Sequence, residues 1–134
     1  MTLYFKIKNK KSKIDGFGAF ALEDIPARRK IGNLAGEIIS KKEARKRAAS
    51  IDRVAIVEFY DNRALDATTN SNQLKFINHS CKLKTFMRVC YDKVEFYTLK
   101  DIPKGDELTC NYGPTHHAGT KACRCGATGC IGFL

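Results

Sequence analysis

Residues 85–98 constrain the fold more than any other stretch, because apolar and polar side chains alternate through them with a period of two. The segments TFMRVCYD and VEFYTL are separated at Asp92-Lys93. This pattern predicts a β-hairpin with its turn at that pair, in which every second side chain faces the same side of the sheet. A chain built around such a hairpin is expected to be mainly β.

Two further stretches near the start of the chain support a mainly β fold. Residues 3–8 alternate apolar and basic side chains, which predicts an edge strand, and residues 15–22 read as a tight turn at two glycines followed by a strand. A turn at Pro26 then precedes two short strands, which we expect to be broken by Gly32 and Gly36.

The remaining short segments are less uniform in pattern. Residues 54–60 are compatible with a strand or with a buried helical turn, because periodicity does not separate the two in so short an apolar run. Residues 108–112, LTCNY, are predicted to form the last short strand. The sequence has no internal repeat and no low-complexity linker.

One helix is predicted, over residues 41–49, KKEARKRAA. Ser40 is a suitable N-cap, and Glu43 stands three residues later, where it would complete a capping box. The basic residues of the last turns complement the negative end of the helix macrodipole. Because its side chains are mostly polar, the helix is expected to be short and to lie on the surface.

Size and composition indicate a single domain with a real core, since the chain has 134 residues of which 43% are hydrophobic. No apolar run approaches the roughly 18 residues that a membrane-spanning helix requires. The first residues mix charged and aromatic side chains without the apolar core of a secretory signal. We therefore expect a soluble intracellular protein with no membrane association.

The formal net charge of +10 is unevenly distributed. Residues 1–49 carry 13 Lys/Arg against 5 Asp/Glu, a balance of +8, whereas residues 50–70 carry 2 against 4, a balance of −2. A basic surface indicates a nucleic-acid or other polyanionic partner, or simply a solvated face, and charge alone does not separate these. Acidic side chains that a basic peptide substrate could use as a docking surface are Asp52, Glu58, Asp61 and Asp66.

Cysteine spacing indicates a metal site. Three of the six cysteines, Cys123, Cys125 and Cys130, lie within CRCGATGC, and thiolates at such spacing suit a tetrahedral zinc ion. A structural zinc site needs four ligands, so one must come from elsewhere in the chain. Candidates for that ligand are Cys81, Cys90 and Cys110, with His116 and His117 behind them.

The stretch FINHSCK, residues 76–82, places an asparagine, a histidine and a cysteine together between apolar residues. Its local reading is a turn between strands with a small buried cysteine. In order along the chain, GFG, AGEIISKKEA, FINHSC, KDIPKGDELTCNYG and CRCGATGCIGFL resemble the motifs of SET-domain protein lysine methyltransferases with a post-SET zinc-binding tail. The resemblance runs from about residue 12 to Leu134.

This resemblance implies a fold and a domain organisation. The SET fold consists of several small β-sheets with a C-terminal pseudoknot, one short surface helix and a zinc-stapled tail. The implied division is a SET domain over residues 1–114 and a post-SET tail over residues 115–134. In this family the cysteine matching Cys81 binds zinc, so the implied ligands of one structural Zn²⁺ are Cys81, Cys123, Cys125 and Cys130. Cys90 is then expected in the core.

The resemblance also implies an activity: transfer of methyl groups from S-adenosylmethionine to the lysine amine of a basic protein, histone or histone-like. Tyr112 matches the catalytic tyrosine of the family. The implied cofactor contacts are Asp15, Gly16, Phe17, Tyr60, Lys75, Phe76, Asn78, His79, Phe133 and Leu134. We expect a nuclear protein if the source is eukaryotic and a cytoplasmic one otherwise.

Four features depart from the family pattern. Cys110 stands where an aromatic residue usually lies two residues before the catalytic tyrosine, and Leu34 replaces a common tyrosine. Leu83-Lys84 stand where a Pro-Asn pair often follows NHSC, and the insert between Gly36-Glu37 and Asp66 is short, with no cysteine-rich pre-SET region before the domain. Because Cys110 is smaller than an aromatic residue, we predict a wider lysine channel that admits higher methylation states. The alternative function is a weakly active or inactive SET-fold binding module that holds nucleic acid or a chromatin-like partner.

Overall fold

A computed structural model describes residues 3–14, 16–50, 55–68, 71–80 and 84–110. Within these ranges the chain is mainly β, as the sequence predicts, with one α-helix and one 3₁₀ turn, η1 (Gln73–Phe76). The expected pseudoknot and zinc-stapled tail fall on residues 111–134, outside the described residues. No helix within the described ranges combines the length and the apolar character needed to cross a membrane.

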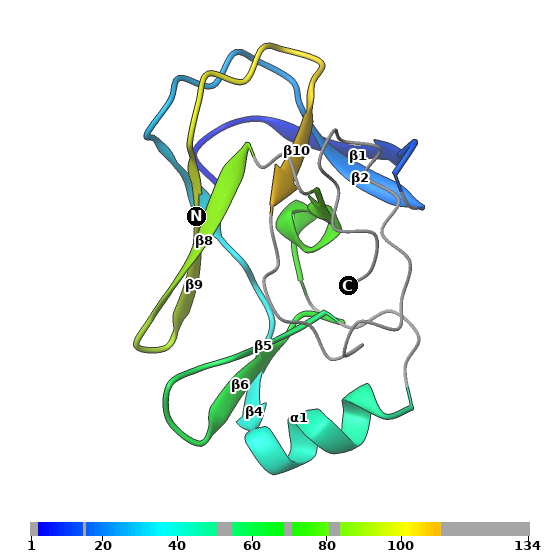
Figure 1. The fold of residues 1–134 in the computed structure, drawn as a ribbon, viewed down its shortest axis with the longest axis vertical. Coiled ribbons are helices and arrows are strands. Elements are labelled where there is room, and N and C mark those ends of the chain that lie inside the picture. Colours follow the sequence, from blue (N-terminus) through cyan, green and yellow to red (C-terminus); the bar gives the residue numbers. More distant parts are fainter. Residues whose placement is uncertain (1–2, 15, 51–54, 69–70, 81–83, 111–134) are drawn as a thin grey trace.

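Most strands join one large sheet, drawn in the upper part of Figure 1. Its order is β1-β2-β10-β8-β9-β3, and β7 pairs with β10 beside this path. The strands are β1 (Ile7–Lys11), β2 (Phe17–Ala21), β3 (Lys30–Asn33), β7 (Asn78–His79), β8 (Thr85–Cys90), β9 (Lys93–Thr98) and β10 (Glu107–Cys110). β10 runs antiparallel to β2 and parallel to both β7 and β8, so it joins three segments distant in sequence.

The predicted hairpin is confirmed as β8 and β9, although its turn is shifted. Cys90 pairs with Lys93, so the two connecting residues are Tyr91 and Asp92 rather than Asp92 and Lys93. Tyr91 has a φ of 55°, in the left-handed region that ordinary residues rarely adopt. The turn therefore needs an unusual backbone angle at a tyrosine, which side-chain alternation does not reveal.

Other strand boundaries also differ from the sequence prediction. The first strand covers Ile7–Lys11 rather than residues 3–8, and Leu3 instead makes an isolated bridge to Gly32. Gly32 lies within β3, beside an irregularity in register, so only Gly36 separates the two predicted strands. A Cβ at Gly36 would lie 2.5 Å from a backbone carbonyl oxygen, which explains the glycine.

A second, smaller sheet lies at the lower end of Figure 1, with the order β4-β6-β5. Its antiparallel strands are β4 (Glu37–Ser40), β5 (Ile56–Glu58) and β6 (Arg63–Asp66). The ambiguous stretch 54–60 therefore contains a strand within its described residues. Helix α1 (Lys41–Ala48) packs beside this sheet.

Helix α1 begins as predicted, but its capping box is only half formed in the contacts observed. The Ser40 hydroxyl accepts a hydrogen bond from the backbone N–H of Glu43 at 3.1 Å. The Glu43 carboxylate accepts instead from Nε of Arg47, one turn later, at 3.0 Å. Only Ala44 of the helix is buried, so the predicted surface position is confirmed.

The main apolar core lies against the large sheet. It contains residues with at most 1% exposure, among them Ile25, Ile31, Leu74, Val94, Ile102 and Leu108. The expectation that Cys90 lies in the core is wrong: it is half-buried near the hairpin turn. Cys110 is the buried cysteine instead, at 1% exposure, because β10 runs through the middle of the sheet.

Candidate functional site

Two motifs that lie far apart in the sequence meet at the start of β2 in the large sheet. The ring of Phe17 packs edge-to-face against that of Phe76, with centroids 6.2 Å apart. The Asn78 side-chain amide donates a hydrogen bond to the backbone carbonyl of Phe17 at 3.1 Å. Three of the predicted cofactor-binding residues are therefore in direct contact.

Gly16 provides the turn that brings Phe17 to this position. Its φ of 44° lies in the left-handed region, where glycine carries no Cβ penalty. Its carbonyl accepts a hydrogen bond from the backbone N–H of Ser12 at 2.7 Å, which closes the turn between β1 and β2. Phe17 begins β2 with 55% of its surface exposed, so its ring is available to a ligand.

The backbone of Asn78 is held in place by the parallel pairing of β7 with β10. Asn78 lies opposite Thr109, and His79 lies opposite Cys110, in the β7–β10 pair. The backbone N–H of Ser80 extends this pairing by donating to the carbonyl of Cys110 at 3.1 Å. Asn78 is consequently buried at 6% exposure. This pairing sets FINHSC beside the strand that directly precedes Asn111-Tyr112 in the sequence.

Glu107, on β10, is a residue of this site that sequence reasoning missed. Both of its carboxylate oxygens accept from the Ser12 hydroxyl at 2.9 Å, and Oε2 also accepts from the Asn78 amide at 3.0 Å. The carboxylate thereby links the β1–β2 turn to β7. Glu107 stands inside the DELTCNYG motif, which was the available signal, but nothing in the sequence assigns it this role.

The carboxylate of Glu107 also explains the second glycine of GFG. A Cβ at Gly18 would overlap Oε2 of Glu107, and it would lie 3.1 Å from Cβ of Ser12. The carboxylate cannot move away without breaking its bonds to Ser12 and Asn78. Gly18 therefore lies within β2 to admit Glu107, whereas Gly16 alone supplies the turn.

Lys75 lies next to Phe76 on η1, and its ammonium group is held by a backbone carbonyl. Its Nζ donates to the backbone carbonyl of Thr68 at 2.7 Å and lies 5.2 Å from the centroid of the Phe76 ring. The two side chains border an open hollow of about 350 Å³, lined by Asn9, Ser71, Asn72, Gln73, Lys75 and Phe76. A ligand in contact with Phe76 could thus also reach the Lys75 ammonium.

Tyr60 is not brought to this cluster. It follows β5 on the small sheet and is 90% exposed. Figure 1 shows β5 and β6 at the opposite end of the molecule from β1 and β2. The surroundings of Tyr60 do not support its predicted contact with the cofactor, and that contact stays a prediction.

The remaining predicted site residues are His79 and those that lie outside the described ranges. His79 is described only through its backbone pairing. Within the described ranges no group of three or more His, Cys, Asp and Glu residues could hold a metal ion. Predicted site residues that lie outside the described ranges are Asp15, Cys81, Tyr112, Cys123, Cys125, Cys130, Phe133 and Leu134.

Two of the positions that depart from the family pattern are buried. Leu34 is 9% exposed and belongs to the main apolar core. Burial raises the pKa of the Cys110 thiol to about 11, although a hydrogen bond with Thr85 opposes the shift. Cys110 therefore carries a neutral thiol at physiological pH.

The acidic residues of segment 50–70 are paired within the small sheet and its helix, as far as they are described. Glu58 contacts Arg45 at 3.3 Å, Asp61 contacts Arg63 at 2.9 Å, and Asp66 contacts Arg47 at 2.9 Å. Asp66 is also largely buried, and Asp52 lies outside the described residues. These three carboxylates each have a cationic partner within the fold, and the docking role of this segment stays a prediction.

Comparison with known proteins extends these observations. Residues 16–113 match the SET domain. The chain is 35% identical over 141 residues to Histone-lysine N-methyltransferase ASHH1 of Arabidopsis thaliana, covering 98% of this chain and 29% of that protein. It is 33% identical to the Histone-lysine N-methyltransferase, H3 lysine-4 specific, of Schizosaccharomyces pombe, covering 92% of this chain and 14% of that protein.

A third relative is the Histone-lysine N-methyltransferase, H3 lysine-36 specific, of Saccharomyces cerevisiae, 32% identical over 134 residues. This match covers 92% of the chain and 18% of the yeast protein. The chain thus spans less than a third of the length of each of these three relatives. Because the SET-domain match covers most of the sequence and includes the Gly16, Asn78 and Glu107 cluster, the chain belongs to the SET-domain family.

Proposed function

We propose that the protein transfers methyl groups from S-adenosylmethionine to the side-chain amine of lysine in a basic protein, histone or histone-like. The observation that carries the proposal is the convergence of the Gly16-Phe17 turn and Asn78 on β10, which ends two residues before Tyr112. Relatives that are histone-lysine N-methyltransferases by name support the same activity and substrate class.

The described cluster fits the proposed methyl donor in chemical character. Phe17 and Phe76 offer apolar ring surface, and the β1–β2 turn allows close backbone approach at Gly16. The Asn78 amide is fixed by Phe17 and Glu107, so its orientation is set before any ligand binds. We further assign cofactor contacts to Asp15, His79, Phe133 and Leu134 by family pattern, with Lys75 at the rim.

S-adenosylmethionine, when bound, supplies an electrophilic methyl group on a sulfonium. The protein must align a neutral lysine amine with it, because methyl transfer is an in-line displacement. Lysine has a reference pKa of about 10.4, so an apolar channel is needed to favour its uncharged form. We assign to the Tyr112 hydroxyl the task of orienting that amine. By family pattern we assign Cys110, whose thiol is buried and neutral, to the wall of this channel, where it would leave more room than an aromatic ring.

We also propose a post-SET tail over residues 115–134, following a SET domain over residues 1–114. One structural Zn²⁺ would be held by Cys81, Cys123, Cys125 and Cys130, a set of four thiolates that suits tetrahedral zinc. Since Phe133 and Leu134 follow directly, removing zinc should weaken cofactor binding. Metal analysis of the purified protein should give one zinc per chain, and its absence would refute the assignment.

The decisive experiment measures transfer from labelled S-adenosylmethionine to a panel of lysine-rich proteins, including histones. Tyr112→Phe should lower kcat by at least about a hundredfold, because it removes one oriented hydroxyl. Tyr91→Phe removes the same atom from an 87% exposed ring at the β8–β9 turn and serves as the matched control. Equal activity in both variants would contradict the role of Tyr112. Cofactor binding without any transfer by the parent would favour a SET-fold binding module.

The methylation state and the location in the cell follow from the same proposal. If Cys110 widens the channel, mass spectrometry should find di- or trimethyl-lysine, and Cys110→Tyr should shift the product toward monomethyl-lysine. In a eukaryotic source the protein would act in the nucleus. Its net charge of +10 supports an additional association with nucleic acid or chromatin.

A further inference from the structure

The outward face of the β8–β9–β3 part of the large sheet carries aromatic rings, where solvent-facing strand positions ordinarily carry polar side chains. Phe86 and Tyr97 are cross-strand partners whose rings stack with centroids 5.3 Å apart and an interplanar angle of 13°. Phe86 is still 38% exposed, and nearby Tyr4 is 64% exposed. These rings present flat apolar surface to solvent.

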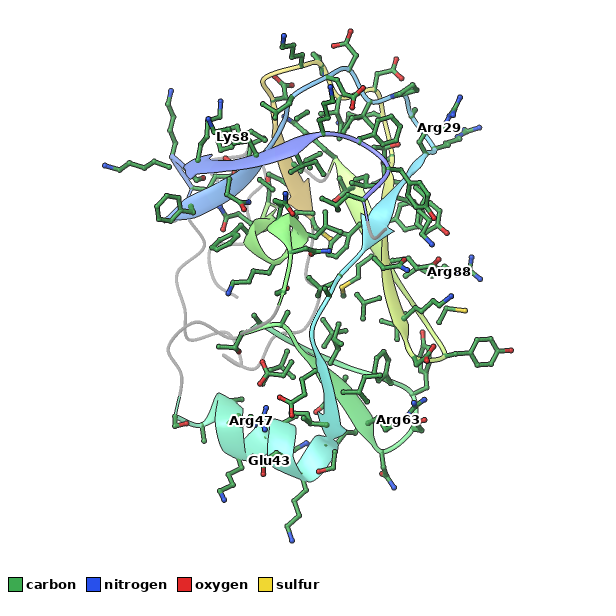
Figure 2. All side chains as sticks on the ribbon, turned by 180° about the vertical axis from the view of Figure 1, so that it is seen from behind. Lys8, Arg29, Glu43, Arg47, Arg63 and Arg88 are labelled. Atoms are coloured by element: carbon green, nitrogen blue, oxygen red, sulfur yellow. The ribbon has the colours of Figure 1, made fainter. Side chains whose placement is uncertain are left out.

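Cations surround the rings. Lys30 lies opposite Tyr97 in the β3–β9 register, and its Nζ is 5.8 Å from the centroid of the Tyr4 ring. Arg88 of β8 points to the same face as the stacked pair, and its side chain is 60% exposed. Figure 2 shows Arg29, just before β3, and Arg88 projecting from the same side of the molecule.

The carboxylate on this face is covered by its neighbours. Glu95 Oε2 lies 2.7 Å from Nζ of Lys30, and Oε1 lies 4.0 Å from Nε of Arg88. The Glu95 side chain is only 12% exposed, and the hydrogen bond from Lys30 holds its pKa below the usual range. Glu95 offsets the charge of Lys30, so the net positive charge offered to a partner beside the rings comes from Arg88 and Arg29.

We propose that this aromatic-basic face, formed by Tyr4, Lys30, Phe86, Arg88 and Tyr97, binds single-stranded nucleic acid. Unpaired bases stack on exposed rings, while nearby cations neutralise the phosphates. A duplex keeps its base faces inside its own stack, so this combination favours single strands. A cross-strand aromatic pair and the Lys30–Glu95 ion pair can serve sheet stability alone, but sheet stability does not require the exposed Tyr4 ring or the 60% exposed Arg88 side chain.

Fluorescence anisotropy with labelled oligothymidylate and oligouridylate, and with a duplex of equal length, tests the proposal. The parent should bind both single strands more tightly than the duplex, and the affinity should fall between about 0.05 and 0.2 M salt. Methyl transfer is not a readout, so this outcome is independent of the proposed activity. Equal or tighter binding of the duplex, or no binding at the lowest salt, would overturn the proposal.

A pair of charge variants locates the binding face. Arg88→Gln should weaken binding several-fold and reduce the slope of log Kd against log salt by about 0.7, the loss expected for one phosphate contact. Lys8→Gln removes the same charge from exposed β1, which Figure 2 places on the other side of the molecule. Lys8→Gln should leave the affinity unchanged. Equal losses in the two variants would show binding by diffuse charge and reject this face.

A second pair separates stacking from apolar contact. Phe86→Leu keeps an apolar side chain but removes the ring, so it should weaken binding about tenfold, whereas Phe86→Tyr should retain it. Unchanged affinity in Phe86→Leu would reject the stacking role. If Phe86→Leu also lowers the midpoint of thermal unfolding, its loss of binding does not isolate stacking. The comparison of Arg88→Gln with Lys8→Gln then decides whether this face binds the strand. Displacement of the oligonucleotide by an equally charged polyglutamate at the same concentration would also overturn the proposal, because that polymer has no bases.

Discussion

The two sheets of this molecule are stabilised in different ways. The large sheet packs against a broad apolar core, in which Ile31 and Leu108 are completely buried. The small sheet and α1 share a small apolar cluster built on Ala44, Ile56 and Ala64. Leu65 of the small sheet also joins the main core, so it is the α1 side of that sheet that has little buried apolar area and draws on charged contacts as well.

Those contacts converge on Arg47 of α1. Its guanidinium lies 2.9 Å from Asp66, 3.0 Å from Glu43 and 3.2 Å from Glu37. Burial alone would raise the pKa of Asp66, but hydrogen bonds from Thr68 and Arg47 outweigh it and lower the pKa below its usual value. The candidate site belongs to the sheet held by apolar burial, so its geometry should be insensitive to changes in this charge network.

The largest expected effect is a loss of global stability in the large sheet. Leu108→Ala removes a side chain with no exposed surface from β10 and should cost about 3 kcal/mol of unfolding free energy. Ile56→Ala, at a position that is 8% exposed in the small cluster, is the matched comparison and should cost less, because that cluster is smaller than the main core. Urea unfolding monitored by circular dichroism measures both. Similar losses would remove the distinction between the two sheets.

Alkaline pH should weaken the large sheet through Cys110. The pKa of its thiol in the folded state is raised from 9.0 to about 11. The stability that the neutral buried thiol contributes is therefore complete below pH 9 and is lost as the pH rises toward 11. The loss should approach about 3 kcal/mol, at about 1.4 kcal/mol per unit of pKa. Thermal midpoints across this range should fall less steeply for Cys110→Ala than for the parent. Parallel curves would rule out this thiol as the source.

The small sheet should instead lose stability at acid pH. Because the folded pKa of Asp66 is lowered, its contribution is present above its unfolded pKa, near 3.8, and is lost as the pH falls through the folded value. Asp66→Asn weakens hydrogen bonds to a charged group and should cost about 2 kcal/mol at neutral pH. Hydrogen exchange should localise the change to α1, β4 and β6. Exchange that rises equally in β8 and β9 would contradict a local effect.

The smallest expected effect is confined to the candidate site. Glu107→Gln keeps the shape of the side chain but replaces one accepting oxygen with an amide nitrogen, so the contacts with Ser12 and Asn78 cannot all persist. Affinity for S-adenosylmethionine should fall about tenfold, or about 1.4 kcal/mol. Glu23→Gln, whose side chain accepts from the Lys6 backbone outside the site, is the matched control. Calorimetry that gives equal affinities for both variants would refute this role.

Local patterns predicted the local features of this fold. The alternation in residues 85–98 predicted the hairpin, and the Ser40 cap predicted the start of α1. The turn lies one residue earlier than predicted, because the strands pair as far as Cys90 and Lys93 and leave Tyr91 in a left-handed conformation. No propensity of tyrosine favours that conformation, so only the completed register could reveal it.

The candidate site was only partly predictable. Motif resemblance identified Gly16, Phe17, Phe76 and Asn78, and the structure brings these residues together. The role of Glu107 depends on pairing between strands distant in sequence, and the paired part of β7 is only two residues long. Such a short strand has no periodicity to detect, so its partner could not be inferred from the sequence.

The central position of β10 has a consequence for protein synthesis. During synthesis β1, β2 and β7 leave the ribosome well before Glu107, yet β10 is the strand with which both β2 and β7 pair. Until that strand emerges, Asn78 lacks both its parallel neighbour and its carboxylate. The candidate site is therefore incomplete in the nascent chain until β10 has left the ribosome, although most of its residues have already been synthesised.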